Sequence, residues 1–249
     1  MHRSGTTLLG RLLAEHPETS GFINTGVPAD EGQHLQSVYP PAREFGGPGR
    51  FAFAKESGLN ETSPLVDQAR NQLLDDWKPY WDTTRKVLIE KSPPNLLRFR
   101  FLQAVFPDAH LVAVLRHPIA VAYATQKWSK TSIPSLLEHW LVAHERFKND
   151  IPLLKNLHEV RYEDLIAKSE TTIASLETAL DLKPQIPQGV IEKGSNESYF
   201  ERWNSEKKRP LTGIKLRRAT KEFEERANSF GYSIAQPIEK FSNIFPVTA

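Results

Sequence analysis

The stretch MHRSGTTLLGRLL, residues 1–13, combines a tight turn with the start of an amphipathic helix, because leucines follow the turn at helical spacing. Backbone N–H groups at the start of such a helix favour an anion. A guanidinium before the glycine and two hydroxyl groups after it suit a phosphate or sulfate. The stretch therefore predicts a phosphate-binding turn, although an ordinary capped helix shares its pattern. The residues of this turn are Arg3, Ser4, Gly5, Thr6 and Thr7.

Beyond this turn the chain alternates strands and helices. Short apolar runs predict buried strands at 87–89 and 110–115, and a weaker one at 159–162. Strands that alternate with helices favour a mostly parallel sheet covered on both faces. We therefore expect one α/β domain over residues 1–249, a three-layer sandwich with a central sheet flanked by helices. Apolar spacing predicts helices at 95–106, 133–147 (capped by Thr131 or Ser132), 169–180 and 220–230.

The segment from about 24 to 64 lacks this periodicity and is rich in proline and glycine. It predicts a long loop region. Loops of this length inside a compact domain are usually functional or disordered. We expect it to lie on the side of the site where an acceptor would bind.

Three polar side chains lie at the ends of the predicted strands: Lys91, Arg116 and Tyr162. The carboxyl ends of parallel strands meet at one edge of a sheet, where open α/β sheets bind ligands. Any one of these residues alone could belong to a surface salt bridge. Together with Arg3 they predict a site for a nucleotide that carries two separate phosphate groups.

These motifs resemble those of the sulfotransferase family, in the same order and at similar spacing over roughly residues 1–182. The segment RSGTT at 3–7 resembles the family's 5′-phosphosulfate loop, in the form found in tyrosylprotein and many bacterial members. LRHP at 115–118 resembles the 3′-phosphate motif, and EKSPPN at 90–95 the strand-end lysine motif. VRYEDL, which contains Tyr162, resembles a further family segment. The resemblance implies a P-loop NTPase-like fold.

The resemblance also implies the activity. Family members transfer a sulfuryl group from 3′-phosphoadenosine-5′-phosphosulfate (PAPS) to a hydroxyl or amine acceptor and release 3′-phosphoadenosine-5′-phosphate (PAP), by in-line displacement without a metal. The catalytic candidates are Arg3, Glu31, His34 and Lys91, and the donor-binding candidates are Arg3, Ser4, Gly5, Thr6, Thr7, Arg116, Thr125, Tyr162 and Lys207.

The chain departs from the family pattern in three places. Ala124 occupies the usual position of a serine that binds the 3′-phosphate, which makes the adjacent Thr125 the candidate. Pro93 stands where the cytosolic branch has its catalytic histidine. The C-terminal lysine-bearing segment of that branch is not evident. Lys207, Lys208 or Arg209 are candidates to replace it, although clustered charge is more often a solvated face.

A general base is expected in GVPADEGQHLQ, residues 26–36. Glu31 and His34 are three residues apart, so on a helix both would face one cleft. We favour Glu31, because it best matches a glutamate of the tyrosylprotein branch and because the usual histidine site is Pro93. The alternative is a solvent-exposed helix start, where the helix dipole favours carboxylates.

Composition narrows the other possibilities. The formal net charge is only +2, so the chain lacks the excess of positive charge that is typical of nucleic-acid-binding proteins. It contains no cysteine, which fits a reducing compartment. No apolar stretch is long enough for a membrane span, no metal-ligand spacing is visible, and we expect a cytoplasmic enzyme.

The residues are compatible with four classes of acceptor: a small molecule, a glycan, a lipid or a peptide. The alternatives are a PAP-binding protein without turnover and a P-loop-type small-molecule kinase, which the absent GxxxxGK[ST] motif disfavours.

One feature of the phosphate-binding turn is unusual: no apolar run precedes Arg3. In folds of this kind a central strand leads into the turn. We expect that an upstream strand of about six to ten residues belongs there. Without it, neighbouring strands would keep unpaired buried backbone groups, each of which costs about 1–3 kcal/mol.

Overall fold

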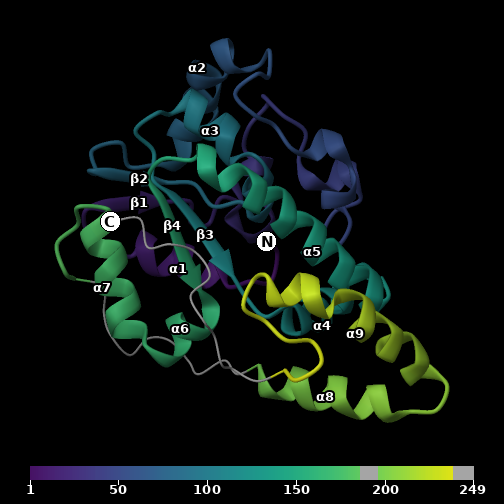
Figure 1. Ribbon diagram of the computed structural model, residues 1–249. Helices are drawn as coiled ribbons and strands as arrows, with labels where there is room; N and C mark the ends of the chain where they lie inside the picture. The colour runs from purple at the N-terminus through teal and green to yellow at the C-terminus, as the bar shows by residue number, and fades with distance from the viewer. Residues whose placement is uncertain (186–195, 238–249) are drawn as a thin grey trace.

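The structure, a computed structural model, describes residues 1–185 and 196–237 (Figure 1). It alternates short strands with helices, as expected for an α/β domain. In chain order the helices and strands are α1 (Thr6–Ala14), β1 (Thr19–Gly21), α2 (Val66–Trp77), β2 (Val87–Ile89), α3 (Phe99–Val105), β3 (Leu111–Leu115), α4 (Pro118–Ser129), α5 (Ile133–Asp150), β4 (Leu157–Arg161), α6 (Tyr162–Ala167), α7 (Ser169–Ala179), α8 (Glu197–Lys208) and α9 (Thr212–Asn228).

The strands form two parallel pairs. β1 pairs with β2, with Thr19 opposite Val87, and β3 pairs with β4, with Leu111 opposite Leu157. Within the described residues no ladder joins β2 to β3, so the expected central sheet is present as two pieces. All pairing is parallel, because helices make the crossovers between paired strands.

Helices cover both faces of the strands, which confirms the three-layer α/β class. On one face α1, α6 and α7 enclose an apolar cluster that includes Leu12, Val114 and Leu176. On the other face a larger core surrounds Phe101 and Trp140, to which α2, α3, α4, α5 and α9 contribute. In Figure 1, α7 lies to the left of β3 and β4, α6 lies below them, and α4, α5 and α9 lie to the right.

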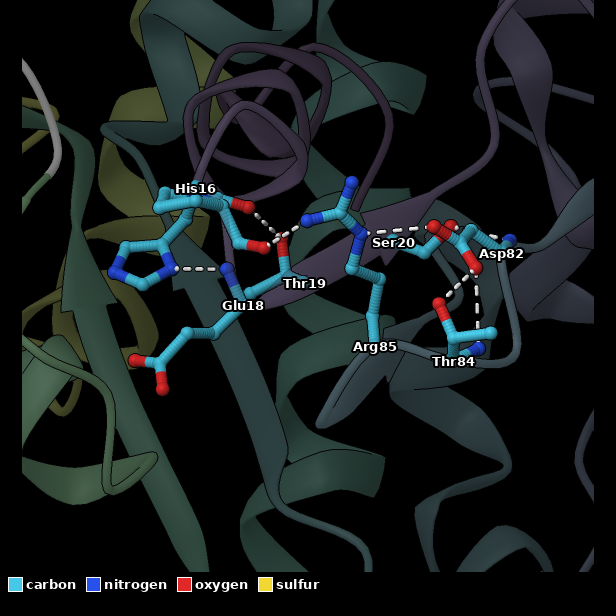
Figure 2. A network of polar contacts seen from close by, with 8 residues as sticks. His16, Glu18, Thr19, Ser20, Asp82, Thr84 and Arg85 are labelled. Atoms are coloured by element: carbon cyan, nitrogen blue, oxygen red, sulfur yellow. Dashed lines mark hydrogen bonds and ion pairs between the residues drawn. The ribbon is translucent and has the colours of Figure 1, made fainter.

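Polar contacts hold the start of β1 against the loop that leads to β2 (Figure 2). The backbone N–H of Asp82 donates to Ser20 Oγ at 2.9 Å. Arg85 Nε donates to Asp82 Oδ2 at 2.8 Å, and its guanidinium also donates to the carbonyl oxygen of Pro17. These contacts join the amino ends of β1 and β2.

The strands at 87–89 and 111–115 lie where the sequence predicts them, and α5 begins after Ser132, whose Oγ accepts from the N–H of Ser135. The prediction of one helix over 95–106 is wrong. A 3₁₀ helix at Pro93–Leu97 and α3 meet at Arg98, whose φ is −131°. Arg98 is buried at this junction, and its guanidinium donates to the carbonyl oxygens of Ser57 and Pro40, which compensates for the loss of water.

Other boundaries differ more modestly. The last strand spans Leu157–Arg161 rather than 159–162, and the helix expected at 220–230 begins at Thr212. The segment 24–64 contains only short 3₁₀ helices, in agreement with a long loop region. Tyr39 and Phe51 from this loop are nonetheless buried in the core, so it packs as part of the domain.

Candidate active site

The turn at residues 3–7, which the sequence predicts to bind phosphate, meets the end of β4. Gly5, the residue before α1, has a φ of 99°, which favours glycine. A Cβ atom at this position would lie 2.5 Å from Cδ2 of Tyr162, the first residue after β4. Gly5 is thus required both by its backbone conformation and by the close approach of the tyrosine ring. No side chain caps the first turn of α1 and no acidic residue lies in it, so neither a cap nor a carboxylate of that turn offsets the positive end of the helix dipole.

Arg116, at the end of β3, joins this group. Its Cζ lies 4.0 Å from the centre of the Tyr162 ring, and its Nη1 donates to the carbonyl oxygen of Arg3 at 3.1 Å. Its Nε donates to Asn196 Oδ1 at 2.9 Å. Only 9% of Arg116 is exposed, and burial lowers the pKa of its guanidinium from its usual value. Arg116 therefore ties the turn to both β3 and the start of α8.

Arg3 and Ser4 form the outer part of the turn. Arg3 is exposed, has a φ of 63°, and places its Cζ 4.6 Å from the ring centre of Trp128. Such a left-handed conformation is costly for a side-chain-bearing residue and often marks a functional site. The buried Ser4 Oγ has no hydrogen-bond partner within the described part of the chain. A hydroxyl without a partner in a loop of this kind fits a phosphate ligand.

A buried polar network supports Arg116 from behind. Asn196 Nδ2 donates to Glu163 Oε1 at 2.7 Å, and the backbone N–H of His117 donates to the same oxygen at 2.8 Å. Asn196 thus separates the guanidinium of Arg116 from the carboxylate of Glu163. Burial raises the pKa of Glu163, and the hydrogen bonds from His117 and Asn196 oppose that rise.

Lys91 and Glu31 form the second part of the site, at the end of β2. Lys91 Nζ lies 3.5 Å from Glu31 Oε1 and donates to the carbonyl oxygen of Ala29 at 2.7 Å. Burial lowers the pKa of Lys91 and raises that of Glu31, while the charge of each limits the shift of the other. A Cβ on Gly10 of α1 would lie 3.3 Å from Lys91 Cγ, so α1 packs directly on the lysine stem.

Glu31 is held by its own neighbours rather than by a helix. It lies between the 3₁₀ helices Pro28–Asp30 and Gly32–His34 with extended backbone angles, and it is 6% exposed. Its Oε2 accepts from Gln33 Nε2 at 2.5 Å. The alternative of a solvent-exposed helix start is therefore wrong for Glu31.

Glu90 supports this loop from the end of β2. Ser92 Oγ donates to Glu90 Oε1 at 2.5 Å and accepts from the N–H of Gln33 at 2.8 Å. Asn95 Nδ2 donates to the other carboxylate oxygen. Burial raises the pKa of Glu90 to about 7, and its hydrogen bonds with Ser92 and Asn95 and the charge of Lys91 limit the rise. Glu90 thereby connects the strand end to the loop that carries Glu31.

His34 lies close to this pair. Its pKa is lowered by burial and by the positive charges of Arg43 and Lys91, so the imidazole is neutral near pH 7. Its Nδ1 is buried and has no hydrogen-bond partner among the described residues. Glu31 and His34 are therefore both within the electrostatic reach of Lys91, although not on one face of an α-helix as expected.

Two candidate residues lie further from these contacts. Thr125 is buried on α4, where its Cγ2 lies 3.3 Å from the position that a Cβ on Gly49 would occupy. Lys207, near the end of α8, donates from Nζ to the carbonyl oxygen of Ala235 at 3.2 Å. The turn between α8 and α9 projects away from the N-terminus in Figure 1. The role of both residues in donor binding stays a prediction.

The described residues contain no cluster of three or more His, Cys, Asp or Glu side chains arranged to hold a metal ion. Over the same residues, no helix combines the length and apolar character that a membrane crossing requires.

Comparisons with known proteins agree with this geometry. A sequence model described as the sulfotransferase family matches residues 1–185, and the chain therefore belongs to this family. Among solved structures, the sulfotransferase domain from the curacin biosynthetic pathway is similar, with a TM-score of 0.51 and 17% sequence identity. The match covers 89% of this chain and 94% of that domain, and it supports the P-loop-like sulfotransferase fold. No curated protein matches this chain. The family and the fold support sulfuryl transfer as the general reaction.

Sequence reasoning missed several residues of the site. Glu90 and Glu163 lie inside the motifs EKSPPN and VRYEDL, so their positions beside strand ends were a usable signal. Asn196 and Trp128 carried no such signal, because α8 and the last turn of α4 approach the phosphate-binding turn only in the folded chain.

Proposed function

We propose that this protein transfers the sulfuryl group of PAPS to a hydroxyl acceptor, with Glu31 as the general base. The observation that carries the proposal is the pair Lys91 and Glu31, 3.5 Å apart, at the strand end next to α1. A cation and a carboxylate at one end of a phosphate-binding helix provide the two groups that such a transfer needs.

The donor would bind at the other part of the site. The first turn of α1, with Thr6 and Thr7, suits the 5′-phosphosulfate, and Arg3 adds a positive charge there. Arg116 beside Tyr162 suits the second phosphate group, because the guanidinium is held by neutral partners and keeps its charge for an anion. The unpartnered hydroxyl of Ser4 fits the same group of ligand oxygens.

In the reaction the acceptor oxygen attacks sulfur, and the bond between sulfur and the 5′-phosphate oxygen breaks. Glu31 takes the acceptor proton, and PAP leaves with the negative charge that develops on its phosphate. Lys91 neutralises that charge where it develops in the transition state. The raised pKa of Glu31 strengthens it as a base relative to an exposed carboxylate.

The test is transfer of labelled sulfate from PAPS to a panel of phenols, sterols, glycans and peptides, with PAP binding measured in parallel. We expect sulfate transfer to at least one hydroxyl class and protection of the protein by PAP. Protection by ATP, with phosphoryl transfer, would indicate a kinase instead. Tight PAP binding with no transfer across the panel would indicate a binding protein without turnover.

A further inference from the structure

The segment that joins α8 to α9 is strongly basic. Residues 207–221 carry seven cations and no carboxylate. The whole chain has a formal net charge of only +2, so +2 less +7 leaves a net charge of −5 on the remaining residues. Positive charge is thus concentrated on one element of the fold. The seven cations are Lys207, Lys208, Arg209, Lys215, Arg217, Arg218 and Lys221.

These cations lie on the outside of the domain. Leu216 and Phe223 of α9 are buried in the larger core, whereas six of the seven cations are exposed and Lys207 is half-buried. Within the described residues, the one carboxylate in ion-pair contact with the group is Glu222, 3.9 Å from Arg218. So long and exposed a pair contributes little. The charge of this surface is therefore left largely unpaired by the described part of the fold.

Two aliphatic side chains lie at the tip of the same segment. Leu211 is 83% exposed and Ile214 is 54% exposed. Leu211 precedes α9 with helical backbone angles, so Leu211, Ile214, Arg218 and Lys221 follow one another at three- and four-residue spacing along one face. This face therefore combines an apolar end with a row of cations, which is typical of helices that lie at a membrane interface.

The surface beside Ile214 is hollowed. A hollow of about 510 Å³ is lined by Ile214, Arg217, Arg218, Lys221 and Glu222. Guanidinium and ammonium groups donate several hydrogen bonds to phosphate oxygens. The hollow thus offers three cations and one aliphatic side chain, which suit the phosphate and the adjoining acyl region of a lipid.

We propose that the segment between α8 and α9 docks this protein on a bilayer that contains anionic lipids, with Leu211 and Ile214 inserted at the headgroups and the cations against lipid phosphates. In Figure 1 the turn projects from the lower right of the molecule, so it can reach a flat surface before the rest of the domain does. The negative potential of an anionic leaflet attracts lysine and arginine and repels the net negative remainder of the chain.

The exposed aliphatic side chains favour a bilayer over a soluble acidic partner. A polyanion in water would use the cations, but it would leave Leu211 and Ile214 in contact with water. Insertion at the headgroups removes that apolar surface from water, which is favourable. The proposal concerns where the protein lies, and it stands whether or not the donor is PAPS.

The test is flotation of the full chain with vesicles of phosphatidylcholine alone or with about 30% phosphatidylserine. We expect the partition coefficient to be about tenfold or more higher for the anionic vesicles. It should fall steeply between about 0.05 and 0.5 M salt, because salt screens exposed charges. Equal binding to the two kinds of vesicle, or binding to neither, would overturn the proposal.

A triple variant tests the cations of α9: Lys215→Gln, Arg218→Gln and Lys221→Gln. Partition into anionic vesicles should fall about 10²-fold, since one cation near such a surface contributes about fivefold, or about 1 kcal/mol. A matched control removes three exposed cations from other elements and should bind almost as the unchanged protein does. An equal loss in the two variants would assign the binding to net charge and overturn the proposal. The control substitutions are Lys55→Gln, Lys78→Gln and Lys168→Gln.

A double variant, Leu211→Ser with Ile214→Ser, separates the bilayer from a soluble polyanion. Both positions are exposed, so circular dichroism should show an unchanged fold. We expect vesicle binding to fall about tenfold or more, while binding to heparin, the polyanion probe, stays as before. If the double variant keeps its full affinity for the vesicles as well, the surface is a site for polyanions, and docking by insertion into a bilayer is overturned.

Discussion

The two halves of the site surround their cations differently. Beside β3 and β4, the guanidinium of Arg116 contacts an amide oxygen, a backbone carbonyl and a tyrosine ring, all of them neutral. Beside β2, the ammonium of Lys91 lies 3.5 Å from the carboxylate of Glu31. The first arrangement leaves the guanidinium without a directly paired carboxylate among these contacts, whereas the second sets a carboxylate next to a cation. Under the proposed function, donor binding would fall to the Arg116 half and proton transfer to the Lys91 and Glu31 half.

The supporting groups follow the same division. Asn196 accepts from Arg116 and donates to Glu163, so a neutral amide stands between the guanidinium and the nearby carboxylate. Gln33 donates to Glu31, and Glu90 holds Ser92, which orients Gln33. Hydrogen bonds thus hold the guanidinium of Arg116 in one half of the site, and they hold the titratable carboxylate of Glu31 in the other half. The predictions below test this division.

The largest effect is expected at Glu31. Glu31→Gln keeps the shape and hydrogen bonding of the side chain but removes its basicity, so turnover should fall about 10²–10⁴-fold with little change in PAP binding. His34→Gln is the matched control and should cost much less. Initial rates at saturating donor, with PAP affinity by calorimetry, give the result. The roles must be exchanged if His34→Gln abolishes turnover and Glu31→Gln retains it.

A smaller effect, on binding, is expected at Arg116. Arg116→Ala should weaken PAP binding about tenfold to a hundredfold, because a hydrogen bond to a charged group contributes about 1.5–3 kcal/mol. Adenosine, which lacks phosphate, should bind almost as before. An equal loss for the two ligands would mean that Arg116 only holds the turn through Arg3 and Asn196. Lys91→Met serves as the contrast, since it should reduce turnover more than PAP affinity.

The contact between the turn before α1 and the end of β4 can be tested at Gly5. Gly5→Ala places a methyl group against the ring of Tyr162 in a backbone conformation that favours glycine. We expect a loss of about 1–3 kcal/mol in the free energy of unfolding, measured by denaturant titration. Gly26→Ala is a useful comparison, because Gly26 also has a positive φ of 82° but open space around its Cβ position. Equal losses would assign the effect to backbone conformation alone.

The smallest effect concerns pH and Glu90. The pKa of Glu90 is about 7 in the folded protein and close to 4.5 when unfolded, so the folded state holds this proton more tightly. Its stabilising contribution is present below pH 4.5 and is lost as the pH rises to 7. Glu90→Gln should remove that slope, which amounts to about 1–2 kcal/mol for a half-buried group.

The measurement for Glu90 is the difference in unfolding free energy between the two proteins from pH 4.5 to 8. A difference is needed because burial lowers the pKa values of His117, His139 and His144 to about 3. Those groups make stability rise between about pH 3 and 6.5, opposite in sign to Glu90. Parallel curves for the two proteins would show that Glu90 keeps an ordinary pKa.

The sequence by itself determined the class of fold and the strand-end residues of the site. Apolar runs that end in Lys91, Arg116 and Tyr162 have few other places to lie in a parallel α/β fold, because strand ends meet at one edge. Gly5 and the leucines after it indicated the turn and α1 from local pattern alone. The chemistry of a turn and the order of the strands depend on residues that are close together in the sequence, so both could be predicted from it.

Only the tertiary structure decided what surrounds those residues. The pairing of Lys91 with Glu31 and the insertion of Asn196 between Arg116 and Glu163 both join segments far apart in the chain. The break in the helix expected at 95–106 has the same origin, since the buried Arg98 donates to carbonyl groups of a distant loop. Hydrogen bonds and burial between remote segments depend on packing, and packing leaves no periodic signal in the sequence.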